Sequence, residues 1–147
     1  MKKLMQRFKN ERGLTLVELL AVIVILAIIA VIAFVMIGKV IDNSKKDAHI
    51  ANAQQLISSA KLYDSQGDFS GTTVNSEELQ KAGLIDELIN PWKSNDSTYK
   101  GTVTKTDGEN GVKYTVKLSG ADVKCNLNKE GLDEKALSGD RDDVCQN

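Results

Sequence analysis

An uninterrupted apolar run near the N-terminus constrains this chain more than any other feature of the sequence. The run covers residues 19–37, and none of these 19 residues has a charged or polar side chain. A helix rises about 1.5 Å per residue, so a run of this length nearly spans the roughly 30 Å hydrocarbon core of a bilayer. The run therefore predicts a helix that crosses a membrane.

A carboxylate at the edge of this run separates it from an ordinary membrane anchor. Glu18 directly precedes the run and is the fifth residue after Gly13. A charge at the middle of a membrane helix costs on the order of 3 kcal/mol, and less near an end, so a retained charge usually has a partner. We therefore expect the carboxylate of Glu18 to have a partner group.

The residues around Glu18 follow a specific order. Arg12 and Gly13 come first, the sequence LTLVELL follows with the acid in fifth place, and an unbroken apolar helix continues from it. This order resembles the class III leader and N-terminal helix of type IV prepilins and pseudopilins. In that family a prepilin peptidase cuts after the glycine and methylates the new N-terminus, and the glutamate interacts with a neighbouring subunit's N-terminus during filament assembly. The resemblance implies cleavage between Gly13 and Leu14, methylation of Leu14 and an assembly role for Glu18.

Two positions depart from the usual pattern of that family. Most members have phenylalanine after the cut, where this chain has Leu14, and many have a proline near the twenty-second mature position, where this chain has Val35. Loss of the proline removes an expected interruption of the helix. Gly38 supplies only weak flexibility nearby.

Charges before the apolar run predict its orientation. The leader has one acid, Glu11, and five basic residues: Lys2, Lys3, Arg7, Lys9 and Arg12. A basic flank before an apolar helix predicts a cytoplasmic N-terminus and an exported remainder. Secretory signals share this polarity, but their apolar region is only about 7 to 15 residues long. We expect a single-pass plasma-membrane protein before assembly and a cell-surface filament afterwards, with a plain signal anchor as the alternative.

The sequence divides into four expected parts. Past Lys39 apolar residues recur at intervals of three and four, which predicts an amphipathic helix. We expect a cleaved leader at 1–13, a transmembrane and filament-core helix at 14–38, its amphipathic continuation at 39–66, and a globular head at 67–147. Gly67 is expected to end the helix. His49, on the continuation, is predicted to be a partly solvated surface residue.

The head reads as a mixture of a short helix and strands. After a turn-rich loop at 67–74, Asn75 and Glu78 have the spacing of a capping box, and Gly83 is expected to end that helix. Trp92, which follows the single proline, is expected to anchor the core or a loop.

Three strands are expected to follow the short helix. Alternating segments at 99–105 and 112–119 predict a hairpin joined by the turn TDGENG, and 122–128 predicts a third strand. The predicted fold class is therefore α+β, with a long N-terminal helix packed on a small three-stranded antiparallel sheet, as in the ladle shape of pilins.

Two cysteines and an acidic tail complete the head. Because the domain is expected to be exported, Cys125 and Cys145 predict one disulfide that ties the final segment to the third strand. Many type IV pilins have a C-terminal disulfide loop of this kind. Asp140, Asp142 and Asp143 resemble the calcium-binding loop of major pseudopilins of type II secretion, but their spacing matches no defined calcium loop. A solvated acidic loop without metal is the preferred interpretation.

The sequence favours a structural role. It has one histidine and contains no metal-spaced His/Cys cluster, phosphate loop or nucleophile elbow, so we expect neither catalysis nor a cofactor. The resemblance implies a filament subunit whose partners are copies of itself, a prepilin peptidase, the membrane and an inner-membrane assembly platform. A pseudopilin of a type II secretion or competence DNA-uptake apparatus is one alternative, and a membrane-anchored binding module that never polymerises is another.

Outward lysines on the expected sheet suggest a further partner. Lys113, Lys117 and Lys124 are expected on the face turned away from the helix. Such a stripe could attract nucleic acid, but it lacks interleaved aromatic residues. A solvated face that resists aggregation is therefore the preferred interpretation.

Overall fold

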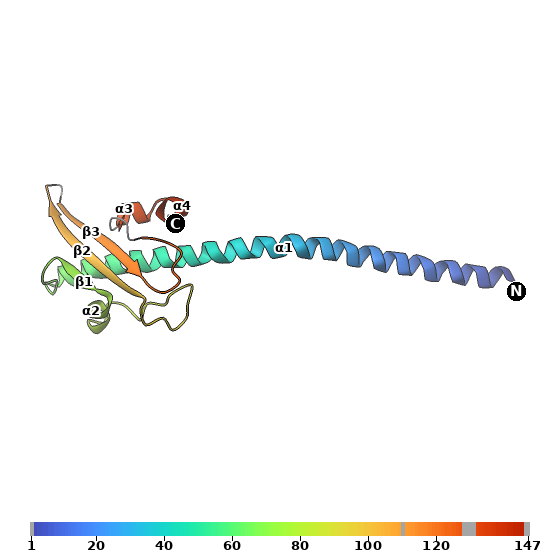
Figure 1. Cartoon of the computed structure of the whole chain (residues 1–147), viewed down its shortest axis with the longest axis horizontal. Coiled ribbons are helices and arrows are strands. Elements are labelled where there is room, and N and C mark those ends of the chain that lie inside the picture. Colours follow the sequence, from blue (N-terminus) through green and yellow to red (C-terminus); the bar gives the residue numbers. More distant parts are fainter. Residues whose placement is uncertain (1, 110, 128–131, 146–147) are drawn as a thin grey trace. The chain divides into compact units, whose positions relative to one another are not determined.

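The computed structural model describes the chain except residues 1, 110, 128–131 and 146–147, and describes side chains from residue 15 onward. The chain divides into two units, Met1–Asp42 and Asn43–Asn147. Helix α1, Lys2–Ser65, forms the first unit and continues into the second (Figure 1).

The first unit is helical throughout its described residues. No proline interrupts this helix, so nothing in the sequence ends it before residue 42. Along the apolar run, leucine and β-branched side chains cover every side of the helix. Among the described residues, α1 is the one helix long and apolar enough to cross a membrane. The apolar side chains of this unit that the structure describes, from Leu16 onward, are exposed within the monomer.

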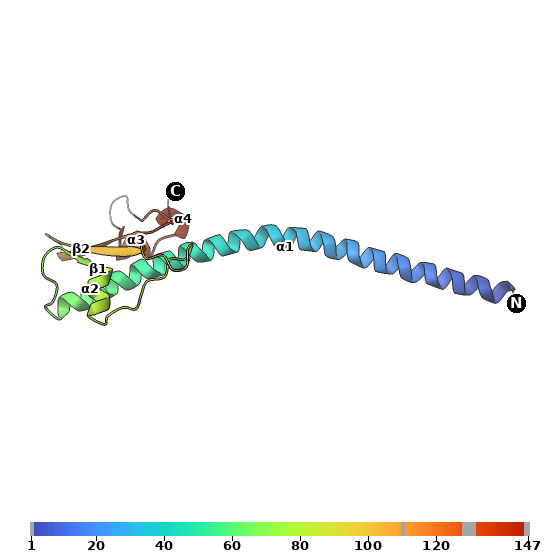
Figure 2. The same cartoon turned by 60° about the horizontal axis from the view of Figure 1, so that its bottom comes forward.

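The second unit packs the C-terminal part of α1 against one face of an antiparallel sheet (Figure 2). In the described part of the chain the sheet has four strands, in the order β1-β2-β3-β4. Their bounds are Thr73–Asn75, Lys100–Gly108, Gly111–Ser119 and Leu132–Asp133. Short helices lie outside the sheet: α2 at Ser76–Lys81, α3 at Glu134–Leu137 and α4 at Arg141–Val144. The predicted α+β class is confirmed.

The core lies between α1 and the sheet. Leu56 of α1 and Val103, Val116 and Leu118 of the sheet are fully buried there. A Cβ atom at Gly101 would overlap the side chain of Leu56, so glycine permits the close approach of β2 to the helix. Other buried apolar residues of this core are Ile50, Ala53, Ile57, Ala60, Val74, Leu79, Ile85, Leu88, Leu127, Leu137 and Val144.

Three local signals in the sequence are confirmed. Gly67 has φ +84° and follows the end of α1, where the backbone N–H of Asp68 donates to the carbonyl of Tyr63 at 3.3 Å. Helix α2 begins after Asn75, whose backbone N–H donates to the carboxylate of Glu78 at 2.8 Å. Gly83, with φ +71°, follows the end of α2.

The third predicted strand is wrong. Residues 122–127 form no ladder with β3, and residue 128 lies outside the described residues. Asp122 has φ +59°, and the carboxylate of Asp96 accepts a hydrogen bond from the backbone N–H of Ala121 at 2.8 Å. These two features turn the chain away from β3. The place beside β3 is taken by β4, which pairs with Thr115 and Val116.

Three other expectations need correction. The end of the loop predicted at 67–74 belongs to β1, which pairs with β2. The hairpin strands extend closer to their turn than the sequence suggested, since Gly108 pairs with Gly111. The acidic tail, interpreted from the sequence as a solvated loop, contains α3 and α4, each capped by an aspartate: Asp133 accepts from the backbone N–H of Ala136 at 2.8 Å, and Asp140 from that of Asp142 at 3.0 Å.

Candidate functional site

The predicted processing site lies in the first helical segment. Gly13 and Leu14 have helical backbone, and the side chain of Leu14 lies outside the described part of the structure. Glu18 lies one helical turn further along, and its side chain is exposed. Within the described residues its carboxylate has no hydrogen bond or ion pair.

The helix around Glu18 presents apolar side chains in every direction. Leu16, Leu19, Phe34 and Ile37 are each more than half exposed, and Phe34 reaches 82%. A helix that is apolar all round is stable only in a membrane or inside a protein assembly. The monomer supplies no such surroundings for the described residues 15–41, which are all exposed.

Residues 8–34 match a family model described as the prokaryotic N-terminal methylation motif. The chain carries this methylation motif. The matched residues include both sides of the Gly13–Leu14 bond, the carboxylate of Glu18 and most of the apolar run. The resemblance to the class III leader of type IV prepilins and pseudopilins is confirmed. Comparisons with curated proteins and with solved structures found no significant match.

The two cysteines lie together in the second unit. A disulfide joins Cys125, in the segment after β3, to Cys145, which directly follows α4. Both residues are buried, with Cα atoms 4.5 Å apart. The bond holds the end of the chain against the segment that was expected to be the third strand. Among residues that the structure describes, no three His, Cys, Asp or Glu side chains are grouped to hold a metal ion.

His49 is buried, so the expectation of a partly solvated residue is wrong. Its Nδ1 lies 2.7 Å from the hydroxyl of Tyr99, and its ring contacts that of Trp92 edge-on, with centroids 5.4 Å apart. Burial lowers the pKa of His49 to about 4, and the nearby backbone of Cys125 offsets only part of this effect. Nε2 of the ring has no hydrogen-bond partner among the described residues. The ring is therefore neutral at pH 7.

The surrounding hydrogen bonds define which ring nitrogen carries the proton. Asn52 donates from Nδ2 to the carbonyl of Ile89 at 3.2 Å and to the hydroxyl of Tyr99 at 3.0 Å. Because a carbonyl only accepts, this amide nitrogen is a donor, and the hydroxyl accepts from it. The phenolic hydrogen is then directed to Nδ1 of His49, which leaves the ring proton on Nε2. Burial also raises the pKa of Tyr99, to about 12.

A second polar cluster joins the end of α1 to the hairpin. Asp64 accepts hydrogen bonds from the ammonium of Lys105 at 2.7 Å and from the hydroxyl of Tyr114 at 2.5 Å. These hydrogen bonds lower the pKa of Asp64, and the contact with Asp64 raises the pKa of Tyr114 to about 12. The ammonium of Lys105 also lies 5.7 Å from the ring centroid of Phe69.

A third cluster ties two loops together through Asp96. Its carboxylate accepts from the hydroxyl and backbone N–H of Thr98, from the side-chain amide of Asn90 at 2.7 Å and from the backbone of Ala121. The hydrogen bonds from Thr98 and then Asn90 lower the pKa of Asp96 most. The loop that contains Trp92 is thereby fixed to the chain leaving β3.

The lysines of the sheet are not a uniform cationic stripe. Lys113 pairs with Asp133 at 3.1 Å, Lys100 pairs with Glu77 and Lys105 pairs with Asp64. Lys117 and Lys124 remain exposed, without an ion pair in the described part of the chain. The arrangement leaves little continuous positive surface for a nucleic-acid backbone.

Proposed function

We propose that this protein is a structural subunit of a type IV pilus-like filament, processed by a prepilin peptidase and polymerised through its N-terminal helix. The observation that carries the proposal is the methylation motif at residues 8–34, which includes the predicted cleavage bond. The exposed apolar helix supports it, because the described residues 15–41 find no cover in the monomer. A membrane covers these residues before assembly, and neighbouring subunits cover them afterwards.

The proposed chemistry begins with cleavage between Gly13 and Leu14. The cut creates a positively charged amine on Leu14, which the same peptidase methylates. When helices pack side by side, this amine meets the carboxylate of Glu18 from a neighbouring copy. In a filament core with little water, pairing offsets a desolvation cost of several kcal/mol per ion.

This ion pair selects one register of neighbouring helices. The apolar side chains of residues 19–37 are mostly Leu, Ile, Val and Ala, which repeat with little distinction along the helix. Packing of such residues alone allows neighbouring helices to slide, whereas a buried polar pair specifies position. We assign Glu18 this role in assembly.

The other parts of the chain follow from the same proposal. Residues 1–13 form the cleaved leader, 14–38 the membrane and filament-core helix, 39–66 its continuation, and 67–147 the exported head. The partners are further copies, the peptidase and an assembly platform in the plasma membrane.

A pseudopilin of a secretion or DNA-uptake apparatus uses the same processing and the same helix, and differs in the length of the filament it builds. A non-polymerising anchor needs neither Gly13 nor Glu18.

The experiment that tests the proposal is intact mass spectrometry after co-expression with a prepilin peptidase. We expect a mature chain that begins at Leu14 and carries one added methyl group on its amine. A chain that stays full length, or that is cut near Ala30 or Ala33 as a secretory signal would be, contradicts the proposal. Electron microscopy of sheared cell-surface material then separates long pili from short pseudopilin filaments.

A further inference from the structure

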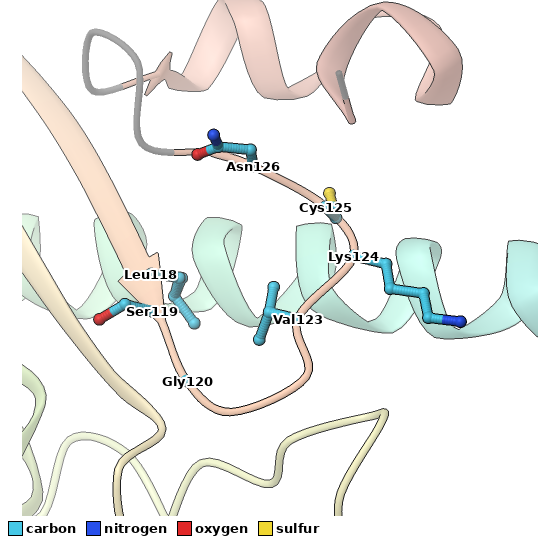
Figure 3. Close-up of a pocket in the computed structure, with 7 residues that line it drawn as sticks. All are labelled: Leu118, Ser119, Gly120, Val123, Lys124, Cys125 and Asn126. Atoms are coloured by element: carbon cyan, nitrogen blue, oxygen red, sulfur yellow. The ribbon is translucent and has the colours of Figure 1, made fainter. Parts of the chain in front are cut away.

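A groove of about 510 Å³ lies between the end of β3 and the segment that follows it. Leu118, Ser119 and Gly120 line one side, and the returning chain from Val123 to Asn126 lines the other. Figure 3 shows the backbone turning after Gly120 and passing back beside β3, with the labelled side chains on both sides of the space. The returning segment stands away from β3, where a third strand would have filled the groove.

Among the residues that the structure describes, the edge of β3 that faces away from β2 is open at the groove. The described pairing of β4 with β3 is limited to Thr115 and Val116, and residues 128–131, which precede β4, lie outside the described residues. Within the described residues, positions 117–119 therefore have β2 on one side and no strand on the other. An open strand edge presents backbone donors and acceptors that can pair with an added strand.

A second open edge lies at the far end of the hairpin. Strand β1 pairs with β2 only over residues 102–104. The backbone of Lys105 still donates to the carbonyl of Thr72 at 2.7 Å, but residues 106–108 have no strand on that side in the described part of the chain. Residues 106–109 are exposed, and this end carries Asp107 and Glu109.

The two open edges differ in charge: the hairpin end carries two acids, whereas the groove has two lysines and one acid, Asp122, at its turn. Asp107 and Glu109 form no ion pair with a described residue. At the groove, Lys124 and the neighbouring Lys117 are exposed and equally without an ion pair. Placing the hairpin end in the groove brings two carboxylates beside two ammonium groups, which favours this pairing over groove-to-groove or tip-to-tip contacts.

The edges also lie at opposite ends of the second unit. Cys125, which lines the groove, lies near His49 of α1, whereas the hairpin contacts Asp64 through Lys105 on its way to the turn. His49 and Asp64 are 15 residues apart on α1, or about 22 Å at 1.5 Å per residue. A contact between two different patches at opposite ends is heterologous and can repeat without closing.

We propose that the hairpin end of one copy, residues 106–109, docks as an added strand against residues 118–120 in the groove of the next copy. Residues 106–108 belong to β2 and Glu109 follows it directly. Four residues at about 3.3 Å each span about 13 Å, which matches the four residues that line the returning side of the groove. The inference rests on the proposed filament function and adds a contact between successive heads. Asp107 and Glu109 of one copy then face Lys117 and Lys124 of its neighbour.

The direct test uses paired cysteines in assembled filaments of the full chain. The variant Asp107→Cys with Ser119→Cys is treated with a short thiol-specific crosslinker, which leaves the native Cys125–Cys145 disulfide intact. We expect a ladder of covalent multimers in denaturing gels, and no ladder from either single variant. Filaments of the double variant that give no multimers overturn the proposed contact but leave the filament function standing. A wild-type chain that forms no filaments contradicts the filament function itself.

Charge reversal provides a second test that does not depend on introduced thiols. Lys124→Glu and Glu109→Lys should each reduce sheared filament by about threefold, as expected for an exposed ion pair, and the double reversal should restore it. Lys93→Glu is the matched control, because Lys93 is also exposed and has no ion pair among the described residues. Leader removal and membrane level should be unchanged in all four. Failure of the double reversal to recover filaments overturns the proposal.

Discussion

The two units of this chain are specified by different kinds of interaction. In the first unit, residues 15–38 contain a single charged side chain, Glu18, among exposed apolar residues. In the second unit, several buried or half-buried polar groups have a defined partner within the chain, such as His49 with Tyr99 and Asp64 with Lys105, although Nε2 of His49 and Nε1 of Trp92 have no hydrogen-bond partner among the described residues. The first unit therefore depends on other molecules for a fixed position, whereas the second is fixed by its own contacts.

The largest effect is expected from the one charge of the first unit. Glu18→Ala should leave membrane insertion intact or improved, because it removes a charge from the bilayer. It should leave leader removal largely intact, because the cut bond lies upstream. Sheared filament should fall by at least about tenfold, because the buried amine of Leu14 loses its partner. Membrane level, leader removal and filament yield are scored together.

Leu19→Ala is the matched control for this prediction. It removes part of an adjacent apolar side chain and leaves the charge in place, so filaments should still form. Normal filaments from Glu18→Ala would remove this carboxylate from its proposed role. Loss of insertion in that variant would also contradict the prediction.

The second unit should be most sensitive to loss of its covalent link. Cys145→Ser opens a closed loop whose cysteines are 20 positions apart, and a loop of this size is worth about 3 kcal/mol in the chain-entropy model. The free energy of unfolding should fall by that amount, while the helicity of α1 is retained. Denaturant unfolding of the full chain in detergent micelles, followed by the fluorescence of Trp92, measures the change.

Thiol labelling checks the premise of this prediction. Native protein exported without reductant should show no labelling at Cys125 or Cys145 until it is reduced. Labelling of both cysteines in the native, unreduced protein would contradict the disulfide.

Acid should weaken the second unit through His49. The folded pKa, about 4, lies below the ordinary value of 6.5, so the unfolded chain binds the proton first as the pH falls. The stability that the neutral ring contributes is fully present above pH 6.5 and declines as the pH falls toward 4. Below pH 4, titration of His49 changes the stability little further. The total loss is up to about 3 kcal/mol. Denaturant unfolding at a series of pH values, again with Trp92 as probe, measures it.

His49→Gln is the variant that isolates this group. Glutamine does not titrate, and its amide oxygen can accept the hydroxyl of Tyr99 in place of Nδ1. Between pH 6.5 and 4 the variant should lose clearly less stability than the wild type, whatever its stability at pH 7. Parallel pH profiles for the two proteins would show that His49 is not the group responsible.

Local sequence signals predicted much of the fold. Gly67 and Gly83 end helices, and Asn75 with Glu78 begins one, because each acts on the backbone of its own turn. The alternation of residues 112–119 likewise predicted β3. The strand expected at 122–128 failed because the turn at Asp122 depends on Asp96, a residue far away in the sequence. Strand alternation alone does not reveal such a contact.

The candidate sites show the same contrast between local sequence signals and contacts between distant residues. Gly13, Leu14 and Glu18 belong to one continuous motif, and the match at residues 8–34 lies where the sequence placed it. The burial of His49 could not be predicted, because it depends on Trp92, Tyr99 and the chain at Cys125, which come together only in the folded unit. A lone histidine among alanine and isoleucine on a helix was the only available signal.

The smallest effect is expected where α1 ends against the hairpin. Asp64 is an acid in the last turn of a helix, where the helix dipole disfavours it, and its bonds to Lys105 and Tyr114 compensate. Because these bonds lower the pKa of Asp64, the stability they give is present above the ordinary pKa of an aspartate. It is lost as the pH falls through the lowered value.

Tyr114→Phe tests this cluster by removing only one hydroxyl. Asp64 keeps its bond to Lys105, and the cluster is partly exposed, so the free energy of unfolding at pH 7 should fall by about 1 kcal/mol. Tyr63→Phe is the matched control, because Tyr63 also lies near the end of α1 but its hydroxyl has no hydrogen bond within the described residues, and this variant should match the wild type. Denaturant unfolding monitored at Trp92 compares the three proteins. Equal losses in both variants would mean that the ring environment, and not the bond to Asp64, determines the effect.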